Sequence, residues 1–164
     1  MKIAITTDHA GYDAVQQLIP FLESLGHECS NYGPKDLDPQ DDYPDFMFPA
    51  AKAVAAGDCE VGIILGGSGQ GEAIAANRIK GVRCAVFYGP VIAQQAINAE
   101  GETSDDPYEI VKLSRQHNDA NILSLSGRFL TLEQMKQAVQ IWLETPFSGA
   151  ERHARRISKL DDFT

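Results

Sequence analysis

The sequence predicts an α/β fold built on a five-stranded parallel sheet with helices on both faces. Short apolar or β-rich runs alternate with amphipathic helical segments from one end of the chain to the other. Successive strands joined by helices form a parallel sheet whose two faces are both covered. Right-handed crossovers place the carboxyl ends of all strands at one edge, which is where open α/β sheets bind ligands.

The individual elements follow from periodicity and from capping residues. Five runs are expected to be strands: residues 2–7, 27–32, 61–65, 83–88 and 122–126. Helices are expected over residues 12–25, 46–56, 72–79 and 150–160, and a capping-box pattern at residues 131–134 begins another. Gly26 and Gly57 end the first two helices. We expect one domain, residues 1–164, to hold all of these elements.

The composition limits the classes of partner. The chain has 164 residues, 43% of them hydrophobic, which is enough for one domain with a substantial core. A formal net charge of -9 argues against nucleic acid or an anionic membrane surface as the main partner. No apolar run is long enough to span a bilayer, and the first residues begin a strand instead of a signal peptide.

The cysteines indicate a reducing compartment. Cys29, Cys59 and Cys84 are odd in number, widely spaced and without a CxxC pair. This pattern is typical of reduced, mostly buried thiols in a cytoplasmic protein. A metal site or a catalytic thiol is the less favoured interpretation of the same residues.

A glycine-rich run, residues 66–72, follows the third expected strand and opens into a helical segment. Its four glycines allow a sharp turn and expose backbone N–H groups to a ligand, and a helix start favours negative charge. Glu72 at the far end of the run is unusual, because a carboxylate repels a phosphate. It is suited to take a proton from carbon while the N–H groups hold the resulting oxyanion. Partial burial is expected to raise the pKa of such a base.

Nucleotide binding is disfavoured by the same run. A dinucleotide fingerprint that starts at Gly67 and Gly69 requires a third glycine where the chain has Glu72, and no Gly-Lys-Ser/Thr follows to make a Walker loop.

Polar residues at the ends of three expected strands should converge on one edge of the sheet. Asp8 and His9 follow the first strand, the glycine run follows the third, and Arg128 follows the fifth. Each has a structural interpretation as well, since Asp8 is well placed to cap a helix and Ser68 to satisfy backbone groups in its turn.

The basic residues gather near the end of the chain, and one internal segment is acidic. Arg152 and Arg156 are four apart and share a helical face. Two interpretations are equally favoured: the two guanidinium groups bind one dianion, or they belong to a solvated surface. Residues near 95–112, above all 98–107, form an acidic, turn-rich excursion that interrupts a helical region between residues 91 and 116. We interpret it as a surface excursion within the domain.

Five segments carry a family resemblance, in matching order and over nearly the whole chain: residues 8–11, 42–45, 66–72 with 75–77, 117–121 and 152–156. On these motifs the sequence resembles the ribose-5-phosphate isomerase B family, which includes the galactose-6-phosphate isomerase subunits. The resemblance implies a Rossmann-like three-layer sandwich, interconversion of an aldose phosphate and its ketose, no metal and no cofactor. It also implies a homodimer, or a dimer of dimers, with sites built from both subunits.

The resemblance also implies roles for individual residues. Some family members carry a cysteine base where this chain has Gly66, so the match is to the branch whose base is a glutamate, here Glu72. His117 would protonate the ring oxygen, with Asp8 assisting, and Ser68 would lie near the reacting oxygens. The implied substrate-binding positions are His9, Tyr43, Gly67, Gly69, Gly71, Asn118, Arg128, Arg152 and Arg156.

Three functions are compatible with these residues. The favoured one is isomerisation of ribose 5-phosphate to ribulose 5-phosphate. The same chemistry on a hexose 6-phosphate or another pentose phosphate is the nearest alternative, because residues 87–116 are longer than usual for the family and follow a strand at the ligand edge. A non-catalytic sugar-phosphate binding protein is disfavoured by the intact Glu72, Ser68 and His117.

Overall fold

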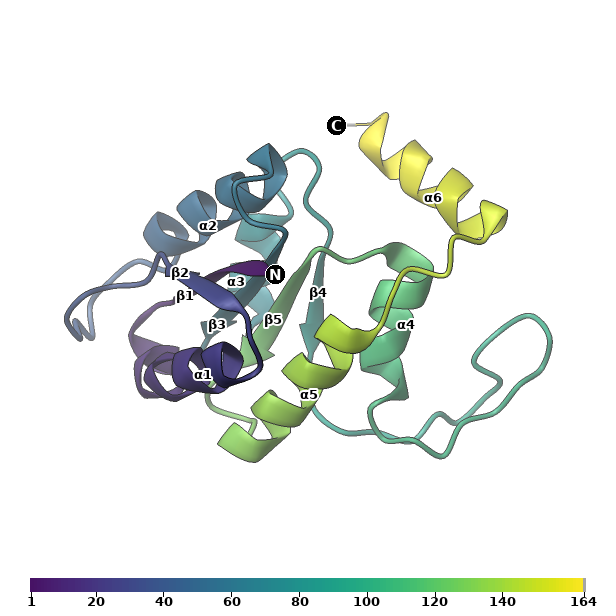
Figure 1. Cartoon of the computed structure of the whole chain (residues 1–164), viewed down its shortest axis with the longest axis horizontal. Coiled ribbons are helices and arrows are strands. Elements are labelled where there is room, and N and C mark those ends of the chain that lie inside the picture. The colour runs from purple at the N-terminus through teal and green to yellow at the C-terminus, as the bar shows by residue number, and fades with distance from the viewer. Residues whose placement is uncertain (164) are drawn as a thin grey trace.

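A computed structural model describes residues 1–163, and its centre is a five-stranded, all-parallel sheet (Figure 1). The strands lie in the order β2-β1-β3-β5-β4. Their bounds are β1 (Lys2–Thr7), β2 (Glu28–Asn31), β3 (Val61–Gly66), β4 (Cys84–Phe87) and β5 (Ile122–Ser126). The predicted α/β class and the parallel sheet are confirmed.

Residues 1–163 also form six α-helices and one short 3-10 turn, and the last two helices follow the final strand. The turn η1 (His9–Gly11) follows β1, and the helices are α1 (Tyr12–Ser24), α2 (Pro44–Ala56), α3 (Gln70–Ala76), α4 (Glu109–Asn118), α5 (Leu132–Glu144) and α6 (Glu151–Asp161). The capping box predicted at the start of α5 is present, with the Thr131 and Gln134 side chains each bonded to the backbone of the other.

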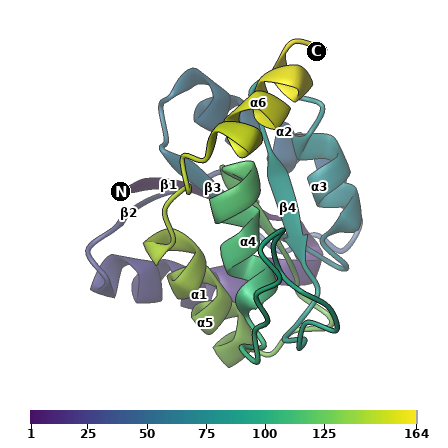
Figure 2. The same cartoon turned by 90° about the vertical axis from the view of Figure 1, so that its right-hand side faces the viewer.

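The helices form a layer on each face of the sheet. Alternate residues of β1 point to opposite sides, so Ile3 and Ile5 pack with α1, α4 and α5 around the buried Trp142, whereas Ala4 packs with α2 and α3 around Met47. Figure 2 looks onto the β4 edge and shows α3 on one side of the sheet and α4 and α5 on the other. Helix α6 extends beyond these layers, above α4.

The topology fixes where a ligand site belongs. The chain passes from β1 outward to β2 and then returns to place β3 on the other side of β1. The carboxyl ends of β1 and β3 therefore flank a topological switch point, the usual ligand crevice of an open α/β sheet. None of the helices in the described residues is long and apolar enough to cross a membrane.

Two predicted helical segments differ most from the observed elements, whereas the other bounds differ by at most two residues. The helix predicted over residues 72–79 begins at Gln70 and ends at Ala76, because Gly69 adopts the left-handed φ of 79° as the N-cap and Asn77 bonds both the N–H and the carbonyl of Cys84. The helical region expected from residue 91 begins only at Glu109. The acidic excursion that precedes it forms turns instead, in which Asp106 accepts the N–H of Tyr108.

Candidate active site

The glycine loop, residues 66–72, is held by the carboxyl end of β5. The Gly66 carbonyl accepts the Gly127 N–H at 2.7 Å, and the Gly67 carbonyl accepts the Ser126 hydroxyl at 2.8 Å. The Gly69 carbonyl accepts the Ser124 hydroxyl at 2.7 Å. Because β5 takes up these carbonyls, the loop has a fixed shape before any ligand arrives.

Glu72 lies in the first turn of α3 and is 4% exposed. Its Oε2 atom has no hydrogen-bond partner among residues 1–163. Burial, assisted by the nearby charge of Asp8, raises the pKa of Glu72, while backbone N–H groups and Arg128 act in the opposite direction. This confirms the expected direction of the pKa shift, and a carboxylate with an unsatisfied oxygen is a competent proton acceptor.

Glu72 borders a cavity of about 380 Å³ at the carboxyl ends of β1, β3 and β5. We name its lining residues the first cluster: Asp8, His9, Ala10, Tyr43, Gly67, Ser68, Gly71, Glu72, Arg128 and Phe129. The convergence that the strand ends predicted is present. The Tyr43 ring lies against Gly71 and the Arg128 guanidinium against Gly67, so an aromatic ring and a cation both border the glycine loop.

Asp8 and His9 form the β1 side of the cavity. Asp8 is buried, caps η1 and accepts the Ala10 N–H at 2.9 Å, so the capping interpretation holds for one of its oxygens. The Nδ1 atom of His9 lies 2.6 Å from Asp41 Oδ1. Ser68 accepts the Gln70 N–H at 3.3 Å, which is the turn-stabilising role considered for it, and remains partly exposed to the cavity.

Asp8, His9 and Asp41 are also the side chains that could hold a metal ion, since one ligand atom of each lies within 4.8 Å of the others. The geometry does not suit coordination by His9 Nδ1. That nitrogen is hydrogen-bonded to the Asp41 carboxylate, which is an obligatory acceptor, so Nδ1 carries a proton.

The remaining predicted site residues form a second cluster near α6: His117, Asn118, Arg152 and Arg156. The His117 ring stacks on that of His153, with centroids 4.3 Å apart. His153 is buried, and its Nε2 lies 3.1 Å from Arg152 Nε. Burial and the neighbouring His153, Arg152 and Arg156 lower the pKa of His117.

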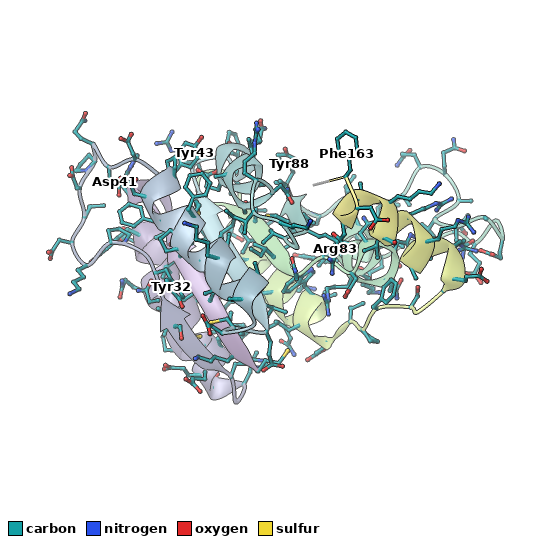
Figure 3. All side chains as sticks on the ribbon, turned by 90° about the horizontal axis from the view of Figure 1, so that it is seen from above. Tyr32, Asp41, Tyr43, Arg83, Tyr88 and Phe163 are labelled. Atoms are coloured by element: carbon teal, nitrogen blue, oxygen red, sulfur yellow. The ribbon has the colours of Figure 1, made fainter. Side chains whose placement is uncertain are left out.

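The two clusters lie apart in a single chain. Asp8, Glu72 and Arg128 follow the carboxyl ends of strands. His117 and Asn118 end α4 and precede β5, which places them toward the amino ends of the parallel strands. Figure 3 shows this separation, with Tyr43 far from Arg83 and Phe163. Arg83 belongs to the second-cluster side, because its Nε donates to the Asn118 carbonyl at 3.1 Å.

Sequence reasoning missed three residues of these clusters. Asp41 bonds His9 across 32 positions and His153 stacks on His117, while Phe129, 75% exposed, borders the cavity. His153 is a member of the 152–156 motif, whereas Asp41 lies one residue before the 42–45 motif. No periodicity or spacing connects position 41 with position 9.

Comparison with known proteins identifies relatives over nearly the whole chain. The Ribose/Galactose Isomerase family matches residues 3–101 and 105–160, which leaves out a short stretch within the acidic excursion and the two ends of the chain. A ribose-5-phosphate isomerase B of Mycolicibacterium paratuberculosis is 37% identical, over 99% of this chain and 91% of its own length. The chain belongs to the Ribose/Galactose Isomerase family.

Solved structures give the same result. Ribose-5-phosphate isomerase B of Clostridium thermocellum superposes with a TM-score of 0.85 at 36% identity, covering 99% of this chain and 97% of that one. The enzyme of Mycoplasma genitalium, solved with bound ribulose-5-phosphate, superposes with a TM-score of 0.84 at 32% identity, covering 99% and 95%.

Proposed function

We propose that this protein interconverts D-ribose 5-phosphate and D-ribulose 5-phosphate, with Glu72 as the base. The observation that carries the proposal is the buried Glu72 carboxyl, with one unpartnered oxygen, at the wall of the switch-point cavity. Family membership supports it, as do the relatives named ribose-5-phosphate isomerase B and the neighbour solved with ribulose-5-phosphate.

In the proposed reaction Glu72 removes the proton from C2 of the open-chain aldose. The C–H electrons form the C1=C2 bond, and O1 becomes the oxyanion of a cis-enediolate. Glu72 then returns the proton to C1 while the O2 proton passes to O1, leaving the ketone at C2. The N–H groups of Gly67 and Gly71, which border the cavity, support the assignment of the oxyanion site, with Ser68 beside the two oxygens. The Gly69 N–H acts on the Glu72 carboxyl instead, so Gly69 shapes the loop and holds the base.

Ring opening precedes the proton transfer. We assign it to His117, which donates a proton to the ring oxygen, and to Asp8, which accepts the anomeric hydroxyl proton. The lowered pKa of His117 favours release of its proton. Tyr43 and Asn118 orient the sugar. His9, Arg128, Arg152 and Arg156 hold the phosphate, whose binding fixes the reacting carbons at Glu72.

Because the two clusters lie apart in one chain, the proposal requires a homodimer in which the second cluster of one subunit completes the first cluster of its partner. Exposed apolar side chains support such an interface: Ile74 on α3, Tyr88 after β4, and Leu160 and Phe163 on and after α6. A cavity of about 580 Å³ beneath α6, bordered by Asn118, Leu160 and Phe163, provides a surface on which a second chain could dock. Further association into a dimer of dimers is compatible with this arrangement.

We propose the cytoplasm as the location and residues 1–164 as one functional domain. The three cysteines are free thiols; Cys59 is buried, whereas Cys29 and Cys84 are half-buried, and unpaired thiols suit a reducing compartment.

A coupled assay on a panel of aldose phosphates tests the function. We expect turnover of ribose 5-phosphate to exceed that of hexose 6-phosphates and of other pentose phosphates. A preference for a hexose phosphate would retain the chemistry and replace the substrate, whereas phosphosugar binding without turnover of any member would overturn the isomerase assignment.

A further inference from the structure

Asp41 and His9 form a short, partly buried pair at the edge of the first cluster. Asp41 Oδ1 lies 2.6 Å from His9 Nδ1 and also accepts the His9 backbone N–H at 3.2 Å. The Asp41 side chain is 7% exposed and the His9 side chain 28% exposed. His9 borders the cavity and Asp41 does not, so Asp41 acts on a ligand only through His9.

The pair fixes the chemical state of the imidazole. A carboxylate only accepts hydrogen bonds, so Nδ1 carries a proton and Nε2 is the ring nitrogen left for a ligand. Asp41 and the charge of Asp8 raise the pKa of His9, whereas burial and Arg128 lower it. The two carboxylates outweigh burial and Arg128, so the charged imidazolium is favoured.

We propose that Asp41 is a positioning residue that holds His9 as a cation with its Nε2–H directed to the substrate phosphate. The role rests on the proposed function only in naming the phosphate as the ligand. Both Asp41 contacts with His9 use Oδ1, and the buried Oδ2 has no partner among residues 1–163, so holding His9 leaves one buried oxygen of Asp41 unsatisfied.

Asp41→Asn tests the inference, and Asp42→Asn is its matched control, because Asp42 is the exposed neighbour in the same loop. NMR titration of the His9 imidazole should show a midpoint above 6.5 in the unmodified protein. In Asp41→Asn we expect the midpoint to fall, because the largest cause of the raised His9 pKa is removed, whereas Asp42→Asn leaves it unchanged. The chain has four histidines, and His9→Gln assigns the signal.

Kinetics give the second readout. At pH 7.5 Asp41→Asn should raise KM and the inhibition constant of inorganic phosphate about tenfold, with kcat within about twofold. The KM of Asp41→Asn divided by the KM of the unmodified enzyme should approach one below about pH 5.5, because His9 is charged in both proteins there. Ionisation of the phosphate itself cancels in this ratio.

The outcomes are separable. An unmodified His9 midpoint at or below 6.5, or one unchanged by Asp41→Asn, overturns the inference, as does a KM ratio that is constant with pH. Absence of isomerase activity in the unmodified protein would overturn the proposed function alone, because the NMR titration and binding of inorganic phosphate still test Asp41. If Asp41→Asn fails to fold, the midpoint in the unmodified protein decides.

A different observation carries a second inference, in the second cluster. Glu100, within the acidic excursion, faces the two terminal nitrogens of Arg152: Nη1 lies 2.8 Å from Oε1 and Nη2 3.4 Å from Oε2. Two parallel contacts from the terminal nitrogens are also a geometry in which a guanidinium holds a phosphate. We infer that Glu100 is an internal anion that competes with the substrate phosphate for Arg152, a role that rests on the proposed function.

Glu100→Gln should lower KM about threefold at unchanged kcat, since an exposed ion pair is weak. Glu102→Gln is the matched control, because it removes a charge from the same excursion but its carboxylate accepts from Asn98. In an Arg152→Ala background Glu100→Gln should have no effect. An unchanged KM in Glu100→Gln, or an equal change in Glu102→Gln, contradicts direct competition. Absence of turnover in the unmodified protein contradicts the proposed function instead. In that case the affinity for inorganic phosphate is compared between the same variants.

Discussion

The carboxyl group of Glu72 lies directly against the backbone of Gly66, in the volume that any side chain at position 66 would fill. A Cβ added to Gly66 would overlap the Glu72 Oε1 and Cδ atoms. The first turn of α3 therefore brings a carboxylate to the end of β3 only because the last residue of that strand is glycine. This close approach explains in physical terms why a chain with its base at Glu72 has glycine at position 66, where some other family members carry a cysteine base.

Gly66→Ala should displace the Glu72 carboxylate. We expect kcat to fall about 10²-fold, the usual effect of misplacing a catalytic group by about 1 Å. Gly62→Ala, in the same strand as Gly66, is the control. A Cβ at position 62 would meet the side chains of Ile122 in β5 and Val54 in α2, away from the cavity. Full kcat in Gly66→Ala, measured in the coupled assay, would contradict the tight placement of Glu72.

Glu72 should make the protein less stable as pH rises. Its pKa is raised in the folded state, so the folded protein binds the proton more tightly than the unfolded chain, and stability falls as pH rises from the ordinary carboxyl value through the folded one. Glu72→Gln, which stays neutral, should therefore gain about 3 °C in Tm at pH 7.5 and almost nothing at pH 4.

Thermal unfolding followed by circular dichroism at the two pH values measures this difference. Glu133→Gln is the control, because Glu133 is an exposed carboxylate on the surface of α5. A Tm gain of Glu72→Gln that is equal at both pH values would show that burial does not penalise its charge.

Arg152→Ala should weaken phosphate binding and leave the chemistry nearly intact. We expect KM to rise about tenfold and kcat to change less than about threefold, because a remote phosphate contact positions the sugar without joining the proton transfer. Arg155→Ala removes a neighbouring exposed arginine that has no assigned phosphate contact, so this variant should behave as the unmodified enzyme. An unaltered saturation curve for Arg152→Ala counts against its phosphate role.

Two inactive chains should complement each other if the site is shared between subunits. A heterodimer of Glu72→Gln and His117→Ala subunits has one site with both changes and one with neither, so it should recover about half of the unmodified activity. Differently tagged chains, co-expressed and purified through both tags, provide this heterodimer. If each chain holds a complete site, the heterodimer stays inactive.

The fold and the first cluster could be predicted because their signals are local. Apolar runs such as 61–65 followed by glycine identify the strand ends, and parallel topology then brings Asp8, Glu72 and Arg128 together without knowledge of any distance. The raised pKa of Glu72 followed from the same placement, since a first-turn residue behind a buried strand is covered by the loop.

The rest depends on contacts that sequence spacing does not encode. The pair of His9 and Asp41 and the contact of Glu100 with Arg152 are set by where two long loops return to the body of the protein. The start of α3 at Gln70 follows from the left-handed conformation of Gly69, and a glycine-rich run permits such a conformation at several positions.

Deuterium incorporation tests the central claim, proton transfer by Glu72, most directly. In D₂O the unmodified enzyme should place solvent deuterium on C1 of ribulose 5-phosphate, because a carboxyl that carries the proton between carbons exchanges it with solvent. Glu72→Gln should lower this incorporation by roughly 10²–10⁴-fold while still binding the phosphosugar. Turnover without any deuterium, or undiminished incorporation in Glu72→Gln, would contradict Glu72 as the base.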